Sequence, residues 1–329
     1  MEKTVLVTGA DGLLGSHVVR RALISGYQVK AFVQPDRDTG SLDGLDVEHY
    51  YGDLTKSDDV RKSVKGCDYI IHTAGSTSVW PDHSPLSWRI NYDAVVALAK
   101  VAEENALKRF IHIGSASSFG YGTKQDPGDE SSAFLGHKFD LDYLESKKTA
   151  QDYLLDQYQQ NGFPVIVLAL TFMIGDFDSA PGAGKMIIGV VKHQVPGYSK
   201  GGKSVVYAGD VAQAAVNALT MGRLGESYIT GGENLTYHEF FDLICHLANV
   251  RPIKWVIPTS LACLFGSILE ILSKFTGKPP MISQTMAAMS GDTHFYKSTK
   301  AITELNMPQT SASEAILRAI EYFMQIGYL

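Results

Sequence analysis

Three glycines spaced three apart, directly after a short apolar run, are the feature that most constrains how this chain folds. Residues 4–7 are β-prone, and Gly9, Gly12 and Gly15 follow them before an apolar pattern with helical spacing. A strand, a tight turn and a helix N-terminus bring free backbone N–H groups and a positive dipole end to one point. Gly9 permits the turn, Gly12 lets phosphates approach the backbone, and Gly15 lets the helix lie close to the strand. The pattern predicts a site for the pyrophosphate of a dinucleotide.

Short apolar segments alternate with helical patterns through the first half of the chain. The predicted strands after the first are 29–33, 47–51, 69–72, 109–113 and 165–170, and the predicted helices include 86–105 and 141–160. This alternation predicts an α/β Rossmann fold, a doubly wound parallel sheet with helices on both faces. Its ligand crevice is expected at the carboxyl ends of the strands.

The regular alternation ends near Gly175, which predicts a second unit. We expect residues 1–175 to form the dinucleotide-binding domain, with residues 205–230 returning to it through a helix and a strand at 227–230. Residues 176–204 and 231–329 are expected to form a smaller, mainly helical, substrate-binding lobe.

Composition excludes several classes of protein. There are 29 basic and 35 acidic residues, a net charge of −6, without a basic cluster that would bind nucleic acid. Cys67, Cys245 and Cys263 lie far apart, so neither a disulfide framework nor a metal site is expected. Because Met1 leads directly into the first strand, we expect no signal peptide and a cytoplasmic protein.

One late segment, Leu261–Phe275, is strongly apolar. It has 15 residues and contains Glu270, whereas a membrane-spanning helix needs about 20 apolar residues, so no transmembrane span is expected. Two alternatives stay open. The segment is either a helix packed over a substrate pocket or an interfacial helix that contacts a membrane peripherally.

Tyr143 and Lys147 are four residues apart in a predicted helix, and residues at this spacing share one face. A free phenol has a pKa of about 10, and a cation about 4 Å away contributes on the order of 4 kcal/mol at an effective dielectric of about 20. Lys147 is therefore expected to bring the pKa of the Tyr143 phenol near neutrality, where it serves as a general acid or base. A second pair at this spacing, Tyr296 and Lys300, has no strand before it and is predicted to be structural.

Further motifs accompany the glycine run and the Tyr143–Lys147 pair. They are Gly52-Asp53-Leu54, His72-x-Ala74-Gly75, Asn91 and Ser115-x-x-x-Phe119-Gly120. In this order they resemble the extended short-chain dehydrogenase/reductase superfamily over nearly the whole chain. The stretch 222–236 resembles its dihydroflavonol-reductase-like, hopanoid-associated epimerase-like and 3β-hydroxysteroid-dehydrogenase-like branch.

The resemblance implies roles for particular residues. Ser115 would hydrogen-bond the substrate oxygen, Tyr143 would protonate it, and Lys147 would hold the nicotinamide ribose. Asn91 would position a water near Lys147, although a core-satisfying asparagine is an alternative. His72 is expected to pack at a strand end rather than to catalyse.

The same resemblance implies a set of cofactor contacts. Asp53 would accept from the adenine amino group, with an N-terminal helix cap as the alternative. Including the residues already named, the expected contacts are Gly9, Asp11, Gly12, Leu13, Leu14, Gly15, Gln34, Arg37, Asp53, Leu54, Thr73, Ala74, Gly75, Tyr143, Lys147, Leu170 and Phe172.

The choice of cofactor depends on the residues after the second strand. Members that prefer NAD place an acid there, and members that prefer NADP place an arginine. This chain has Gln34, which carries neither charge, and then Arg37 between Asp36 and Asp38. We expect NADP(H) to be favoured over NAD(H) because Arg37 is close enough to bind a 2′-phosphate.

The segment after the sixth strand, residues 169–176, lacks the Arg, Asn, Tyr and Pro with which sugar-nucleotide enzymes of the superfamily meet a nucleoside diphosphate. Apolar residues stand there instead. Trp80, Ser117, Phe139, Phe172 and Met173 are candidate pocket residues, although each has an alternative as plain packing or turn capping. Such a pocket favours a small apolar carbonyl compound.

These features predict an NAD(P)H-dependent carbonyl reductase or alcohol dehydrogenase that transfers hydride to an apolar ketone or aldehyde. The alternatives are a sugar-nucleotide epimerase or dehydratase, and a non-catalytic NAD(P)-sensing regulator. The resemblance also implies a homodimer formed through the helices predicted at 86–105 and 141–160.

Overall fold

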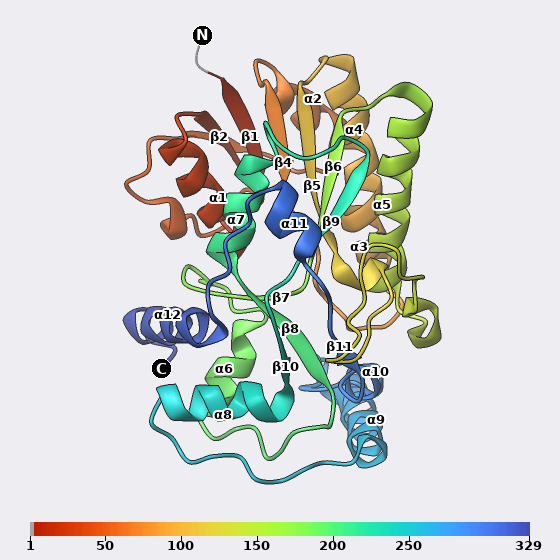
Figure 1. Ribbon diagram of the computed structural model, residues 1–329, viewed down its shortest axis with the longest axis vertical. Coiled ribbons are helices and arrows are strands. Elements are labelled where there is room, and N and C mark those ends of the chain that lie inside the picture. Colours follow the sequence, from red (N-terminus) through yellow and green to blue (C-terminus); the bar gives the residue numbers. More distant parts are fainter. Residues whose placement is uncertain (1–2) are drawn as a thin grey trace.

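The computed structural model describes residues 3–329 and arranges its strands in two sheets (Figure 1). The larger sheet has seven parallel strands, and its order reverses direction between β1 and β4. In sheet order they are β3 (Glu48–Tyr51), β2 (Gln28–Val33), β1 (Thr4–Thr8), β4 (Tyr69–His72), β5 (Arg109–Ser115), β6 (Val165–Leu170) and β9 (Glu226–Thr230). This is the predicted doubly wound Rossmann sheet, with the topological switch at the end of β1.

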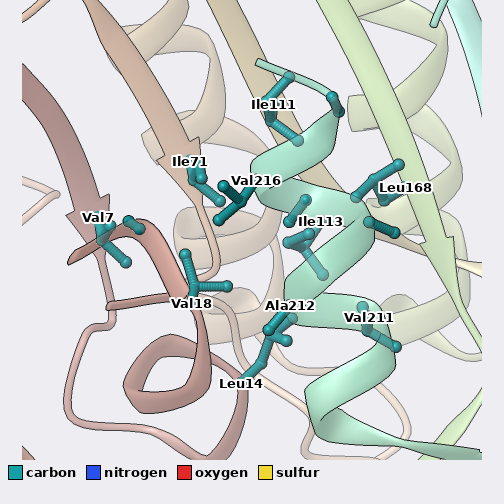
Figure 2. Close-up of a cluster of buried hydrophobic side chains, with 14 of the residues drawn as sticks. Val7, Leu14, Val18, Ile71, Ile111, Ile113, Leu168, Val211, Ala212 and Val216 are labelled. Atoms are coloured by element: carbon teal, nitrogen blue, oxygen red, sulfur yellow. The ribbon is translucent and has the colours of Figure 1, made fainter. Parts of the chain in front are cut away.

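Helices cover both faces of this sheet. On one face, α1 (Leu13–Ile24) and α7 (Ala208–Asn217) pack against each other and on the strands. Figure 2 shows Ile71 and Ile111 from the strands meeting Val18 of α1 and Val216 of α7, all at most 4% exposed. The other face is covered by α2 (Ser57–Val64), α4 (Ala94–Glu104) and α5 (Asp142–Asn161). The predicted helix at 86–105 is instead α3 (Pro85–Trp88), a π-helical turn η2 (Arg89–Asp93) and then α4.

The second, smaller sheet was not predicted. It joins β7 (Phe172–Ile174), β8 (Gly202–Tyr207), β10 (Glu233–Thr236) and β11 (Thr293–His294). These strands are two to six residues long, and the strands that pair are distant from one another in the sequence. Such short segments show little hydrophobic periodicity from which a strand could be predicted. Because β8 lies in this sheet, the chain returns to the larger sheet with α7 rather than at residue 205.

Further helices build the lobe around the small sheet. They are α6 (Gly184–Val191), α8 (Tyr237–Leu247), α9 (Thr259–Thr276), α10 (Gln284–Met289) and α12 (Ala312–Gln325). Helix α11 (Thr299–Glu304) packs instead on the core of the larger sheet. Short 3₁₀ turns occur earlier in the chain, at η1 (Gly40–Leu42), η3 (Ala116–Ser118) and η4 (Gly136–Phe139). Three of the lobe helices, α6, α8 and α12, share one core with β8. In contrast, α9 projects from the lobe beside α10, and Gly266 is its only buried residue (Figure 1). The alternative that this helix is packed over a pocket is therefore wrong.

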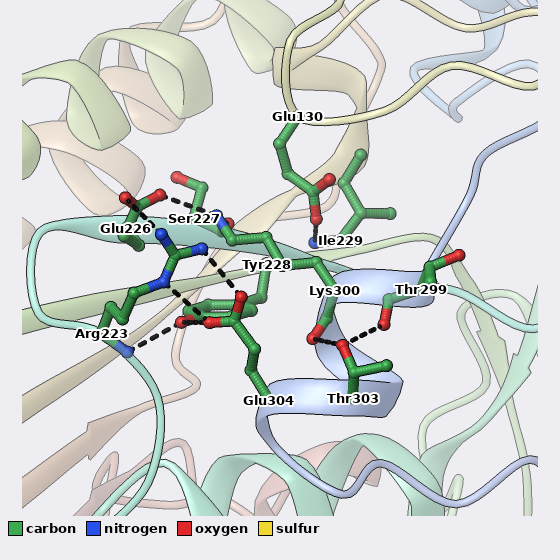
Figure 3. Close-up of polar contacts among 10 residues, drawn as sticks. All are labelled: Glu130, Arg223, Glu226, Ser227, Tyr228, Ile229, Thr299, Lys300, Thr303 and Glu304. Carbon is green, nitrogen blue, oxygen red and sulfur yellow. Dashed lines mark hydrogen bonds and ion pairs between the residues drawn. The ribbon is translucent and has the colours of Figure 1, made fainter.

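A network of charges fastens α11 to the edge strand β9 (Figure 3). Glu304 accepts two hydrogen bonds from Arg223, at 2.9 and 2.8 Å, and one from the Tyr228 hydroxyl at 2.7 Å. Lys300 donates to Glu226 and to the Ser227 carbonyl, both at 2.7 Å. These contacts hold α11 against β9, the edge strand of the larger sheet.

Candidate active site

The glycine run forms the predicted strand–turn–helix at the switch point. Gly9 has a φ of +65°, a left-handed value that glycine adopts without strain. A Cβ at Gly15 would lie 2.0 Å from the Gly9 carbonyl oxygen, so only glycine fits where α1 passes the turn. At Gly12 a Cβ would meet nothing closer than 3.4 Å, which leaves the space outside the turn open.

The N-terminus of α1 has the properties of an anion site. No side chain caps it, and the N–H groups of Leu13, Leu14 and Gly15 have no acceptor among residues 3–329. These orphan donors and the helix dipole fit a pyrophosphate. The residues present therefore fit a dinucleotide here.

The end of β4 forms the second wall of this site. Thr73 donates its hydroxyl to the Thr8 carbonyl at 2.6 Å, and the Ala74 N–H donates to the Thr8 hydroxyl at 3.4 Å. A Cβ at Gly9 would lie 2.9 Å from the Cα of Ala74, so the two loops are in backbone contact. Residues 73–75 thus lie beside the glycine turn, as expected.

Ser115 and Tyr143 come together from different elements. Ser115 ends β5 and is 6% exposed, whereas Tyr143 lies in the first turn of α5. The Ser115 hydroxyl interacts with the phenol and lowers its pKa, but burial outweighs this effect, so the pKa of Tyr143 is raised above its usual value. The expected pKa near neutrality is therefore not found for Tyr143. The causes of this shift are burial and the Ser115 hydroxyl, and not the Lys147 charge on which the expectation depended.

Lys147 points to a different neighbour. Its Nζ lies 3.5 Å from the Ile113 carbonyl oxygen, and a Cβ on Gly75 would lie 2.9 Å from that Nζ and 3.3 Å from Asn91 Oδ1. Burial lowers the pKa of Lys147 to about 8. The ammonium is therefore held against the glycine loop of β4, where the ribose of a bound dinucleotide is expected.

Asn91 is 1% exposed and holds the loop after β4. Its Oδ1 accepts from the Ser76 N–H at 2.8 Å, and its Nδ2 donates to the Ser76 carbonyl at 3.1 Å. The π-helical turn η2 carries it to this position. Asn91 thus hydrogen-bonds buried backbone groups, which was the alternative expected for it. Its Oδ1 also lies near Lys147.

Residues expected to contact the adenosine half lie after β2 and β3. Arg37 donates its Nε to Asp11 Oδ2 at 3.2 Å, while Gln34 is exposed at the end of β2. Asp53 accepts from both the N–H and the hydroxyl of Thr55, which lowers its pKa. One oxygen of Asp53 is therefore used in a local cap, and Leu54 beside it is buried.

His72 behaves as the packing residue that we expected. It is fully buried, its Nδ1 lies 2.7 Å from the Thr8 hydroxyl, and its ring stacks on His112 at 5.5 Å. Burial lowers the pKa of His72 to about 3 and also lowers that of His112, so both imidazoles are neutral. Sequence reasoning did not single out His112.

The expected pocket residues divide into two groups. Phe172 packs edge-on against Phe240 in the lobe core, and Met173 packs against the core on the α1–α7 face, as does Leu170. These three side chains make packing contacts and remain partly exposed. Trp80 lies in the loop after β4 and Phe139 at the end of η4, and both side chains are partly exposed near the start of α5.

Tyr296 is a site residue that the spacing argument assigned to structure only. It is 4% exposed, its hydroxyl has no hydrogen bond of normal geometry, and it interacts electrostatically with Tyr143 and with the hydroxyl of Ser117. Lys300 does not join it, because its ammonium is bound in the β9 network (Figure 3). No sequence signal identifies Tyr296, because long-range pairing with Gly128 and with the Asn234 side chain fixes its position.

Comparison with known proteins decides the family. Residues 5–231 match the model of the NAD dependent epimerase/dehydratase family. The chain belongs to this family. It is thus a member of the extended short-chain dehydrogenase/reductase superfamily and an NAD(P)-dependent oxidoreductase.

Relatives of this family member include reductases and epimerases. It is 25% identical to sterol demethylase protein B of Methylococcus capsulatus over 99% of this chain and 100% of that protein. It is 29% identical to vestitone reductase of Medicago sativa over 69% and 74%, and 26% identical to UDP-glucose 4-epimerase of Vibrio cholerae over 84% and 86%. Among solved structures, that of gox2253 has a TM-score of 0.87 and 28% identity over the whole of both chains.

Proposed function

We propose that this family member is a carbonyl reductase, and in reverse an alcohol dehydrogenase, that uses NADPH to reduce an apolar ketone or aldehyde. The observation that carries the proposal is the meeting of the Ser115 and Tyr143 hydroxyls beside a buried lysine at the switch point. This arrangement holds a substrate oxygen between two hydroxyl donors.

The residues can move the proton that reduction requires. When bound, the nicotinamide supplies the hydride that reaches the carbonyl carbon. Ser115 binds the carbonyl oxygen, and Tyr143 gives its phenolic proton to that oxygen as negative charge develops. Because the pKa of Tyr143 is raised in the free protein, the phenol is protonated and ready to donate. Lys147, held against Gly75, would bind the ribose hydroxyls of the dinucleotide.

The surroundings of Tyr143 support an apolar substrate. Directly beyond the two hydroxyls lies a hydrophobic cluster, which consists of Ala116, Phe119, Ala169, Ile229 and Tyr296, with Tyr121 packed against it. Charged groups meet it at its edge, where Glu130 accepts from the Ile229 N–H and Asp292 accepts from the Tyr121 hydroxyl. Candidate substrates are β-keto acyl compounds, steroid-like or flavonoid-like ketones, and aryl or long-chain aldehydes.

The preference for NADPH is proposed on the geometry of Arg37. Its side chain is 54% exposed, and only its Nε is used, by Asp11. The two terminal nitrogens have no hydrogen bond among residues 3–329, so the planar end of the guanidinium is free for a 2′-phosphate.

A panel of apolar carbonyl compounds assayed for NADPH oxidation tests the proposal. Tyr143→Phe is expected to lower kcat at least about 100-fold while the affinity for NADPH changes little. Tyr153→Phe, on the same helix, is the matched control and is expected to leave kcat unchanged. Equal kcat for wild type and Tyr143→Phe would refute the role of Tyr143.

Sugar-nucleotide epimerisation is the second candidate, and Lys203 is the observation that favours it. Lys203 lies in β8 opposite His294, and its ammonium makes no hydrogen bond or ion pair within the described residues 3–329. Burial lowers the pKa of Lys203 to about 8. An unpaired ammonium fits a phosphate or carboxylate of a substrate. Turnover of UDP-glucose, lost in Lys203→Met, would support this function over carbonyl reduction.

A further inference from the structure

Helix α9 exposes its apolar face to solvent, the reverse of an ordinary surface helix. Its large side chains recur at helical spacing and are 47–84% exposed; they are Leu261, Leu264, Phe265, Ile268, Ile271, Leu272 and Phe275. Trp255 before the helix and Met281 after it are 76% and 70% exposed. A contiguous apolar surface of this kind marks a contact site.

The opposite face of α9 is small and polar, and the protein itself covers it. A Cβ on Gly266 would lie 2.7 Å from the backbone of Ser283, so α9 and the start of α10 are in close contact. Glu270 Oε1 accepts from the Gln284 N–H at 2.7 Å. The inward face is therefore fixed, and the apolar face has no partner among residues 3–329.

The charges around α9 indicate what covers this face. The segment Arg251–Met281 holds four basic residues and one acidic residue, Glu270, for a local charge of +3 in a chain whose net charge is −6. Lys254 precedes the helix, and Lys274 and Lys278 lie at its end, all exposed. Basic residues and an exposed tryptophan at the ends of an apolar helix fit the headgroup region of an anionic membrane.

Among the described residues 3–329, α9 is the one helix that is long and apolar enough to cross a membrane, by length and composition only. The contacts with α10 argue instead for a helix lying in the interface, because the chain turns back directly after Gly277 and packs α10 along α9. A second copy of this chain is less suited to cover the apolar face of α9, because a symmetric contact would bring together two segments that each carry a charge of +3. The dimer implied by the superfamily resemblance would use α4 and α5 instead.

We infer that the apolar face of α9 docks this protein on the surface of anionic membranes. The helix is connected to the expected substrate entrance through α10. Thr285 of α10 donates to Asp82 at 2.6 Å, close in sequence to Trp80. Lys138, whose ammonium lies 4.8 Å from the Phe139 ring centroid, donates to Asp292 just after α10 at 2.7 Å. Docking would place these two aromatic residues near the lipid, from which an apolar substrate enters.

Only this transfer of substrate rests on the proposed function; the docking itself does not. The test therefore measures binding without catalysis, by co-flotation of the full chain with vesicles of phosphatidylcholine alone or with one third phosphatidylglycerol. We expect binding to the anionic vesicles that weakens as salt rises. Vesicles carrying brominated lipid should quench the fluorescence of Trp255 most strongly, and Trp255→Phe should remove the larger part of the quenching, with Trp80 giving the remainder.

Three variants distinguish the outcomes. The double variant Ile268→Glu, Phe275→Glu is expected to lower vesicle binding about tenfold or more, because docking buries the two wild-type apolar side chains in lipid and would have to bury two carboxylates in the variant. Lys274→Ala is expected to lower it about fivefold. The matched control, Ile24→Glu, changes an equally exposed apolar residue on another surface and should have no effect.

Each contrary result overturns the inference. The absence of flotation with either vesicle, or flotation unchanged by the paired glutamates, would exclude docking through α9. Loss of a dimer in these variants without vesicle binding would assign the face to a second copy. Because the altered residues are exposed, thermal unfolding and NADPH binding should match wild type and show that the variants are folded. Reduction of a water-soluble ketone, measured without vesicles, tests the proposed function independently of membrane docking.

Discussion

Gly12→Ala is expected to weaken cofactor binding roughly 100-fold and leave the fold intact. Gly12 is the N-cap of α1, with a φ of −79° and a ψ of 170° that alanine adopts readily. The nearest atom to an added Cβ is the Gly9 carbonyl oxygen at 3.4 Å, an ordinary contact. In the free protein the methyl group therefore fits. It would occupy the space through which a phosphate reaches the N–H groups of Leu13 and Leu14.

The two effects differ in size. Alanine at an N-cap costs up to about 1 kcal/mol relative to better caps, which lowers Tm by a few degrees at most. A hydrogen bond to a charged group contributes about 1.5–3 kcal/mol, so losing one or two at the pyrophosphate costs about 3 kcal/mol. At about 1.4 kcal/mol for each factor of ten, Kd for the dinucleotide rises roughly 100-fold.

Gly15→Ala is the contrasting variant. Its Cβ would lie 2.0 Å from the Gly9 carbonyl oxygen and 2.8 Å from the Ala10 Cα, where only backbone can yield. The helix must separate from the turn, and the packing of α1 on the sheet suffers by about 3 kcal/mol or more. This variant is expected to lose both stability and cofactor binding.

Titration calorimetry with NADPH and NADH, together with thermal unfolding of both free proteins, measures these effects. A Gly12→Ala protein that binds either dinucleotide within about threefold of wild type would refute the assignment of phosphate to the glycine turn. So would a Gly12→Ala protein that unfolds as early as Gly15→Ala, because its defect would then be structural.

Three further predictions follow from the same geometry. Arg37→Met should raise the KM for NADPH about tenfold or more and leave the KM for NADH unchanged in steady-state kinetics. The control is Arg61→Met, which changes an exposed arginine on α2. An equal rise in KM for both dinucleotides would contradict the role of Arg37. Burial lowers the pKa of Lys147 from 10.5 to about 8, so between these pH values the unfolded chain holds a proton that the folded chain has lost. The free energy of unfolding of wild type, measured with denaturant, should therefore rise relative to that of Lys147→Met as pH increases from 8 toward 10.5. A difference in stability that stays constant with pH would contradict the lowered pKa. Tyr296→Phe should leave the free energy of unfolding within about 0.5 kcal/mol of wild type, because its buried hydroxyl has no hydrogen bond of normal geometry to lose; a loss above about 2 kcal/mol would show that the hydroxyl is satisfied in solution.

The dinucleotide half of the site was predictable from sequence. The strand before Gly9, the glycine spacing and the apolar pattern of α1 all act within about twenty residues, so local rules are enough to define the turn. The position of Tyr143 was predictable for a related reason. A helix that follows a parallel strand begins at the carboxyl end of the sheet, where Ser115 also lies.

Other properties depended on segments that meet only in three dimensions. Spacing on α5 suggested that Lys147 would lower the pKa of Tyr143, but burial raises that pKa and the ammonium lies against Gly75 of another loop. Tyr296 enters the site because of its long-range pairing with Gly128 and with the Asn234 side chain. The sequence alone determined the class of fold, the glycine turn and the identity of the reacting groups, since these follow from local backbone geometry and side-chain chemistry. Only the tertiary structure decided the protonation of those groups, the apolar wall around them and the exposure of α9, because desolvation and long-range pairing are properties of the packed chain.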